Sequence, residues 1–160
     1  MTVTNSARQT KNFALSLAKK FLADKAKTKN ALVFALSGDL GSGKTTFVQG
    51  FLKGLGVRKK ITSPTFVLIK NYELRIKNYG NRKRAYHIDC YRIKKSKELL
   101  SLGLKEILNN PQNIALIEWP ENIKRILPKN AIWLKFEHGE NFNKRIIQYK
   151  TNKLDTLKLL

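Results

Sequence analysis

Leu36-Ser-Gly-Asp-Leu-Gly-Ser-Gly-Lys-Thr-Thr46 is the stretch that decides the fold of this chain. It contains the complete pattern G-x-x-x-x-G-K-S/T. The wholly apolar run 31–36 before it predicts a short strand that is buried on both faces. The residues after it predict a helix with one apolar face, formed by Phe47, Val48, Phe51 and Leu52. A strand, a glycine-rich loop and a helix in this order indicate a phosphate-binding loop, or P-loop.

The residue types of this loop suit a polyphosphate ligand. Its glycines permit positive φ angles and a close approach of the backbone to the ligand. Successive N–H groups then point inward as an anion nest, and the helix that follows adds the positive end of its dipole. We expect Lys44 to reach the β- and γ-phosphates of the ligand and the hydroxyl of Thr45 to bind Mg²⁺. The predicted phosphate-binding residues are Gly38, Asp39, Leu40, Gly41, Ser42, Gly43, Lys44, Thr45 and Thr46. The alternative is a tight turn that needs glycine for its shape alone.

Length and composition favour a single soluble domain, residues 1–160, with 42% hydrophobic residues. No apolar run approaches the roughly 20 residues of a membrane span, and no secretory signal is visible. Residues 1–23 lack acidic side chains, as transit peptides do, but their periodicity favours an ordinary amphipathic helix. Cys90 is the single cysteine, which excludes an internal disulfide and a cysteine-based metal cluster. These features predict a cytoplasmic protein without a membrane partner.

The charge balance is strongly basic, with 32 Lys and Arg against 11 Asp and Glu, for a formal net charge of +21. A field of this sign attracts polyanions, so RNA or an acidic partner surface is a plausible partner. Most of these cations are lysines scattered along a chain that is also rich in asparagine, as a general codon bias would produce. Charge alone therefore does not decide whether the basic residues bind a polyanion or reflect codon bias.

The remaining pattern predicts an α/β fold in which helices flank a central, mainly parallel sheet with a β-hairpin addition. Two β-rich runs around a basic turn at 77–83 predict the antiparallel hairpin. The helices are expected at 5–23, after the P-loop as far as Gly54, at 96–109 with a break near Gly103, and from Asn122 to just before Pro128. The strands are expected at 31–36, 65–76, 84–93, 113–117, 131–137 and 144–150.

Acidic and polar residues beyond the P-loop supply candidates for the rest of the site. Glu118 follows an apolar strand, where a P-loop protein places the acid that completes its Mg²⁺ site, although a strand-end glutamate can also simply face water. His87, Asp89 and Tyr91 alternate along a predicted strand and are expected on one face, with Arg92 opposite or beyond it. His87 could act as a general base or serve as a packed core residue.

Four motifs occur together in one order: the P-loop, Ser63-Pro-Thr-Phe66, His87-x-Asp-x-Tyr-Arg92 and Glu118-Trp-Pro-Glu121. Together they resemble the TsaE (YjeE) family of bacterial P-loop ATPases, from the N-terminal helix to about Leu134. Ser42 stands where this family usually has alanine, and Cys90 stands where it usually has an aliphatic residue. Neither departure removes a phosphate or metal contact.

The resemblance implies an ATPase that works with the TsaB–TsaD pair in threonylcarbamoylation of the adenosine beside the anticodon of tRNA. It implies ATP and Mg²⁺ as cofactors, with tRNA reached through the complex and direct contact left open. Thr45 and Glu118 correspond to the metal ligands, and Trp119 lies next to the nucleotide. The expected catalytic residues are Lys44, Asp89 and Glu118.

Three other interpretations stay open on the sequence. Asn152-Lys-Leu-Asp155 spells the N-K-x-D motif that reads guanine in GTPases, but no D-x-x-G switch stands between it and the P-loop. A small-molecule kinase would need an arginine-rich lid, and the arginines here do not cluster. The third interpretation is an RNA-binding module regulated by nucleotide but without catalysis.

Overall fold

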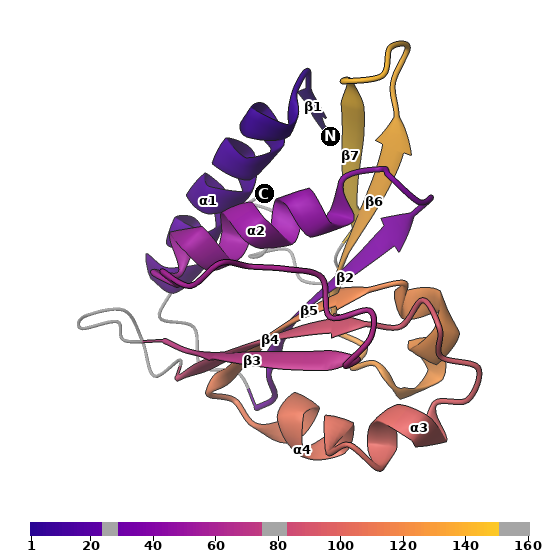
Figure 1. The fold of residues 1–160 in the computed structure, drawn as a ribbon. Coiled ribbons are helices and arrows are strands. Elements are labelled where there is room, and N and C mark those ends of the chain that lie inside the picture. The colour runs from indigo at the N-terminus through magenta and orange to yellow at the C-terminus, as the bar shows by residue number, and fades with distance from the viewer. Residues whose placement is uncertain (24–28, 75–82, 151–160) are drawn as a thin grey trace.

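Helices cover both faces of a seven-stranded sheet in the computed structural model of this chain, which describes residues 1–23, 29–74 and 83–150 (Figure 1). The strands are β1 (Thr2–Thr4), β2 (Leu32–Gly38), β3 (Ile69–Glu73), β4 (Arg84–Asp89), β5 (Asn113–Glu118), β6 (Ile132–His138) and β7 (Arg145–Lys150). The helices are α1 (Ala7–Ala23), α2 (Lys44–Gly54), α3 (Lys97–Leu100), α4 (Leu104–Asn109) and the 3₁₀ helix η1 (Pro120–Ile126).

The sheet order is β1-β7-β6-β2-β5-β4-β3, and its four central strands, β6, β2, β5 and β4, run parallel. The outer strands pair antiparallel, as β3 with β4, β6 with β7 and β1 with β7. This confirms the predicted fold class, including the hairpin addition. Because parallel strands end at the same edge of a sheet, the register brings Leu36 beside Glu118 and Glu118 beside Asp89.

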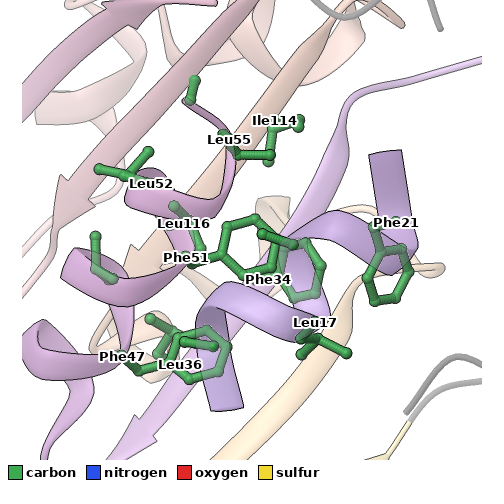
Figure 2. Close-up of a cluster of buried hydrophobic side chains, with 14 of the residues drawn as sticks. Leu17, Phe21, Phe34, Leu36, Phe47, Phe51, Leu52, Leu55, Ile114 and Leu116 are labelled. Atoms are coloured by element: carbon green, nitrogen blue, oxygen red, sulfur yellow. The ribbon is translucent and has the colours of Figure 1, made fainter. Parts of the chain in front are cut away.

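Side chains alternate in direction along the two central strands, β2 and β5, so the buried core is divided between the two faces of the sheet. Phe34 of β2 and Leu116 of β5 point toward α1 and α2, whereas Val33 and Ile117 belong to the cluster under α3, α4 and η1. Figure 2 shows the first cluster, in which Phe34 lies between the helix aromatics and Phe51 is one of its neighbours. Both faces are buried because parallel strands carry helices on each side, as the uninterrupted apolar run predicted.

Helices α1 and α2 pack so closely that glycine is required at their crossing. A Cβ atom on Gly50 would lie 2.6 Å from the Cα of Lys11, and one on Gly54 would lie 2.6 Å from the carbonyl oxygen of Leu15. Real Cβ atoms essentially never approach so closely. This close contact fixes the position of α2, which begins directly after the P-loop.

Three expectations about element limits were wrong. Strand β3 begins at Ile69 rather than near residue 65, because residues 65–68 form a turn in which the N–H groups of Val67 and Leu68 both donate to the carbonyl of Pro64. Strand β4 ends at Asp89, so Tyr91 lies beyond it rather than on a shared strand face. The 3₁₀ helix begins at Pro120 rather than at Asn122. In addition, strand β1 was not predicted, since three residues are too few to show a strand pattern.

Other expectations were confirmed or lie outside the described residues. The helix predicted at 96–109 is broken at Gly103, which has a φ of +84° and separates α3 from α4. Strands β6 and β7 form the expected antiparallel pair. The basic turn at 77–83 falls almost wholly outside the described residues, as does the whole of the guanine-type motif at 152–155. In the described part of the chain, no helix has the length and apolar character needed to cross a membrane.

We predict that Gly50→Ala lowers the free energy of unfolding by about 2 kcal/mol, because the added methyl group is forced against the backbone of α1. Denaturant unfolding followed by far-UV circular dichroism measures this. Lys53→Ala is the matched control, since Lys53 lies on the same helix with an exposed side chain and should change the value by less than about 0.5 kcal/mol. Equal stability of Gly50→Ala and the parent would contradict the close crossing.

Candidate functional site

The P-loop takes the left-handed backbone conformations that its glycines permit. The φ angles are +129° at Gly38, +74° at Gly41 and +100° at Gly43, which L side chains rarely adopt. A side chain at Gly38 would also collide with the carbonyl of Phe136 on the neighbouring strand β6. The loop therefore depends on glycine for both conformation and space, and it leads directly into the N-terminus of α2 at Lys44.

Lys44 lies folded over the loop, with only 4% of its surface exposed. Its Nζ donates to the carbonyls of Gly38 and Asp39 at 2.7 Å each, and to the hydroxyl of Ser42 at 3.4 Å. The same Nζ lies 4.1 Å from the centre of the Trp119 ring, a cation–π contact. Burial lowers the pKa of Lys44, and nearby carboxylates, that of Glu118 foremost, oppose this shift.

Glu118 is a buried carboxylate that joins the P-loop to the neighbouring strands. The Thr45 hydroxyl lies 3.0 and 2.9 Å from its two oxygens, and Nε2 of His87 lies 2.7 Å from Oε1. A carboxylate only accepts hydrogen bonds, so the hydroxyl and Nε2–H both donate to it. His87 is fully buried, and its Nδ1 has no hydrogen-bond partner among the described residues. His87 therefore orients Glu118, and its burial leaves it no access to substrate.

Asp89 is held by the loop that precedes β3. Its Oδ2 accepts hydrogen bonds from the hydroxyls of Thr65 at 2.5 Å and Ser63 at 3.2 Å, and its Oδ1 accepts from the N–H of Tyr91 at 2.9 Å. The motif residues Ser63 and Thr65 thus fix a carboxylate that is 4% exposed. The side chain of Asp89 lines the same pocket as the P-loop.

Trp119 closes the site from the end of β5 in a strained backbone conformation. Its φ and ψ are 58° and 48°, uncommon for a bulky residue and typical of functional sites. Its N–H donates to the carbonyl of Leu36 at 3.2 Å, which ties the turn after β5 to β2. Its ring contacts Tyr91 at a centroid distance of 5.0 Å. The indole ring is thereby held above Lys44.

The structure brings most of the predicted site residues together. One pocket of about 310 Å³ contains these predicted residues together: Leu40, Gly41, Gly43, Lys44, Thr45, Thr46, Asp89, Glu118 and Trp119. The predicted residues Gly38, Asp39 and Ser42 are not among the residues that line the pocket, but they accept hydrogen bonds from Lys44. Arg92 is not among the pocket residues; its guanidinium lies 4.6 Å from the ring centre of Phe66.

The β6–β7 hairpin adds two residues that the sequence analysis missed. Arg145 Nη2 donates to the carbonyl of Gly41 at 3.1 Å, and His138 Nε2 donates to the carbonyl of Leu40 at 3.3 Å. They come from strand ends about a hundred residues away from the P-loop, and only the pairing of β2 with β6 and β6 with β7 brings them to it. No local motif marks them in the sequence.

The oxygens of Thr45 and Glu118 fit Mg²⁺, which prefers hard oxygen ligands and is commonly held by one or two protein groups together with substrate phosphates. The described residues contain no group of three or more His, Cys, Asp or Glu side chains able to hold a metal by themselves. This donor set therefore suits a metal shared with a phosphate ligand rather than a metal held by protein alone. Cys90 contributes nothing here, since burial raises the pKa of its thiol to about 12.

Comparison with known proteins places this geometry in a family. The model of the family described as "Threonylcarbamoyl adenosine biosynthesis protein TsaE" matches residues 4–147. The chain belongs to the TsaE family. Proteins named tRNA threonylcarbamoyladenosine biosynthesis protein TsaE are 38% identical over 151 residues in Rickettsia typhi, covering 94% of each chain, and 35% identical over 129 residues in Haemophilus influenzae, covering 79% of this chain and 77% of the other.

A solved structure supports the same assignment at the level of the fold. The protein described as Bacillus subtilus YdiB superposes with a TM-score of 0.72 at 27% identity, covering 99% of this chain and 88% of the other. The departures of this TsaE-family chain at positions 42 and 90 are compatible with the site. The Ser42 hydroxyl is a partner of Lys44, and Cys90 is fully buried in the second core cluster.

We predict that His87→Phe destabilises the fold and loosens Glu118, because it removes a hydrogen-bond donor from a buried carboxylate. The expected loss is about 3 kcal/mol of unfolding free energy. His87→Gln, which keeps a donor, should recover part of it. Denaturant unfolding of the three proteins at one pH checks this order. Equal stability of the Phe and Gln variants would show that the His87–Glu118 hydrogen bond contributes nothing.

Proposed function

We propose that this TsaE-family chain is a Mg²⁺-dependent ATPase that supports tRNA threonylcarbamoyladenosine biosynthesis together with the TsaB–TsaD pair. The observation that carries the ATPase proposal is the Thr45 hydroxyl within 3.0 Å of both oxygens of Glu118, at the end of a complete P-loop. This arrangement joins the phosphate-binding residues to the acid that a P-loop NTPase needs for its metal. The family assignment supplies the pathway.

Each residue has a defined role in this proposal. Backbone N–H groups of the P-loop bind the phosphates, and Lys44 exchanges its bonds with the loop carbonyls for the β- and γ-phosphates. Thr45 and Glu118 would hold Mg²⁺, which offsets the charge that develops on the phosphoryl oxygens. Asp89 is the candidate for positioning the attacking water, because it lies in the same pocket and its orientation is fixed by Ser63 and Thr65.

The site is least complete in the cation that would face the γ-phosphoryl group of ATP. Arg92, the motif arginine, is engaged with Phe66. A missing arginine finger costs about 10³–10⁵ in rate. The engagement of Arg92 with Phe66 supports the proposed dependence on a partner, since a partner could insert a cation or reorder the Asp89–Arg92 segment.

The observed site also weighs on the rival functions. A small-molecule kinase would need an arginine-rich lid, and no arginine is among the described residues that line the pocket beside the P-loop. Release of phosphate from ATP without any phosphorylated acceptor would separate an ATPase from a kinase. A binding module without catalysis would bind tRNA with an affinity that depends on salt and does not change when nucleotide is added.

A basic cleft in the described part of the chain favours direct RNA contact. A cleft of about 1070 Å³ lies between α1, α2 and the connector after α2. Within the described part of the chain, its lining has no carboxylate and these six cations: Arg8, Lys11, Lys53, Arg58, Lys59 and Lys60. We propose it as the place where tRNA phosphates bind if this chain contacts tRNA outside the complex.

We predict that Lys44→Ala reduces ATP hydrolysis at least about a hundredfold, because the transferred phosphoryl group loses its nearest cation. Phosphate release measured at saturating Mg²⁺–ATP tests this. Lys135→Ala is the control, since Lys135 is an exposed lysine of β6 that pairs with Glu137 and should retain the parent rate. Equal rates for Lys44→Ala and the parent would refute the assignment.

We predict that Trp119 fluorescence reports nucleotide binding. Mg²⁺–ATP should draw Lys44 away from the indole ring, whose emission is sensitive to a cation 4.1 Å from its centre. Trp133→Phe leaves Trp119 as the sole tryptophan, and titration with Mg²⁺–ATP should change its emission. Lys44→Ala in this background should abolish that change. An unchanged spectrum at saturating nucleotide would place Trp119 away from the binding event.

We predict that the isolated chain hydrolyses ATP slowly and that the TsaB–TsaD pair accelerates it at least about tenfold. Asp89→Ala and Glu118→Ala should abolish the stimulated rate, whereas Arg92→Ala tests whether the missing cation is internal. Steady-state phosphate release with and without the pair is the measurement. Full activity of the chain alone, unchanged by the pair, would disprove the dependence.

A further inference from the structure

The connector 55–68, between α2 and β3, carries the two hydroxyl groups that orient Asp89 (Figure 1). Ser63 and Thr65 both donate to Oδ2 of Asp89, and their own hydroxyl oxygens lie 2.6 Å apart. Ser63 is nevertheless exposed to solvent. A surface segment keeps such a geometry only where further contacts hold its backbone. The orientation of Asp89 therefore depends on the contacts that fix this connector.

Lys70 of β3 holds the connector through three hydrogen bonds from one ammonium group. Its Nζ lies 2.6 Å from the hydroxyl oxygen of Thr62, 3.4 Å from the carbonyl oxygen of Thr62 and 3.2 Å from the carbonyl oxygen of Ser63. An ammonium group has three N–H donors and no acceptor, so three oxygens match its capacity. Hydrogen bonds from a charged donor are also stronger than those between neutral groups. Lys70 thus ties the residues just before Thr65 to the edge strand of the sheet.

Strand pairing places this ammonium group on the same face of the sheet as Asp89. Lys70 lies opposite His87 in the antiparallel β3–β4 pair, and directly opposed residues project to the same face. Asp89 follows two residues after His87 and shares that face. The N–H of Asp89 donates to the carbonyl of Leu68 at 3.0 Å, which extends the pairing to the end of β4. The sheet therefore fixes both Lys70 and Asp89, and the connector is bonded to both.

Lys70 itself lies outside the pocket beside the P-loop. Ser63, Thr65 and Asp89 line that pocket, whereas Lys70 is not among its lining residues. An effect of Lys70 on a bound ligand therefore has to pass through the connector and the carboxylate that it holds.

We propose that Lys70 is a positioning residue for ATP hydrolysis, an inference that rests on the ATPase function proposed above. Its ammonium group fixes the backbone at Ser63, and this aims the hydroxyls of Ser63 and Thr65 at Asp89. Asp89 in turn keeps the orientation needed to place the attacking water. Without the ammonium group the connector can turn its hydroxyls toward solvent, and Asp89 loses two of its donors. The loss falls on the chemical step, because the phosphate-binding loop and the metal ligands are unchanged.

The test is steady-state hydrolysis of Mg²⁺–ATP by the full chain, alone and with the TsaB–TsaD pair. Calorimetry with Mg²⁺ and a non-hydrolysable ATP analogue measures binding separately. Lys70→Met keeps the apolar stem and removes the charged donor. It should lower kcat about tenfold and change KM and the Kd of the analogue less than about twofold. Lys70→Arg keeps a charged donor and should recover most of the rate.

Asn71→Ala is the matched control, since Asn71 is the exposed neighbour of Lys70 on the same edge strand and should retain the parent kinetics. A double variant tests the route through the connector. Ser63→Ala should itself lower kcat, and Lys70→Met in that background should add less than about a twofold loss, because both changes remove the same support of Asp89. Far-UV circular dichroism should show every variant folded at the assay temperature.

Several results would overturn the inference, and they differ in meaning. An unchanged kcat in Lys70→Met would show that Lys70 has no part in the reaction, and an unfolded Lys70→Met would assign the residue to stability alone. A raised KM at unchanged kcat, or losses from Lys70→Met and Ser63→Ala that multiply, would show that it does not act through Ser63.

Failure of the proposed function has its own signature. A parent chain that binds the analogue but does not hydrolyse ATP, alone or with the pair, would remove the ATPase function and the inference with it. A selective loss of kcat in Lys70→Met, restored in Lys70→Arg and masked by Ser63→Ala, supports the positioning role.

Discussion

The parallel pairing of β5 between β2 and β4 is the constraint on which the site depends. It aligns Leu36 with Glu118 and Glu118 with Asp89, so the P-loop and both carboxylates emerge at one edge of the sheet. Two backbone hydrogen bonds extend this register beyond the strands, from Trp119 to Leu36 and from Cys90 to Glu118. A shift of one residue in either pairing would turn an acid into the core and remove it from the loop.

The electrostatics of the site contrast with the charge of the whole chain. A protein with a formal charge of +21 buries two of its few carboxylates here and gives each of them hydrogen-bond donors. Glu118 accepts hydrogen bonds from Thr45 and His87. Asp89 accepts hydrogen bonds from Ser63 and Thr65. Buried carboxylates are tolerated only when they are satisfied in this way. Both acids line the pocket beside the P-loop, where Lys44 is the single cation among the described lining residues.

The same edge of the sheet also holds the strained and exposed parts of the protein. Trp119 and Leu68 have positive φ angles, which bulky residues rarely adopt. Trp119 follows Glu118 in the chain, and the carbonyl of Leu68 accepts a hydrogen bond from the N–H of Asp89. Phe66, 84% exposed, and Phe142 lie on the loops that border the site. Strain and exposed apolar surface concentrate where a ligand or partner is expected, whereas the α1–α2 face is closely packed.

The sequence by itself determined the glycine-rich loop pattern, its flanking strand and helix, the mainly parallel sheet and the place of Glu118 at the end of a buried strand. These features follow from local spacing. Few other structures need glycine at the fixed positions of the loop, and an apolar run that ends at an acid is typical of a buried strand that leads to the site. Only the tertiary structure decided that His87 orients Glu118, that Ser63 and Thr65 hold Asp89, and that Tyr91 lies outside the strand. It also brought Arg145 to the P-loop across two strand pairings. Local patterns carry no information on such contacts, because long-range register and the exact ends of strands are set by packing between segments far apart in the chain.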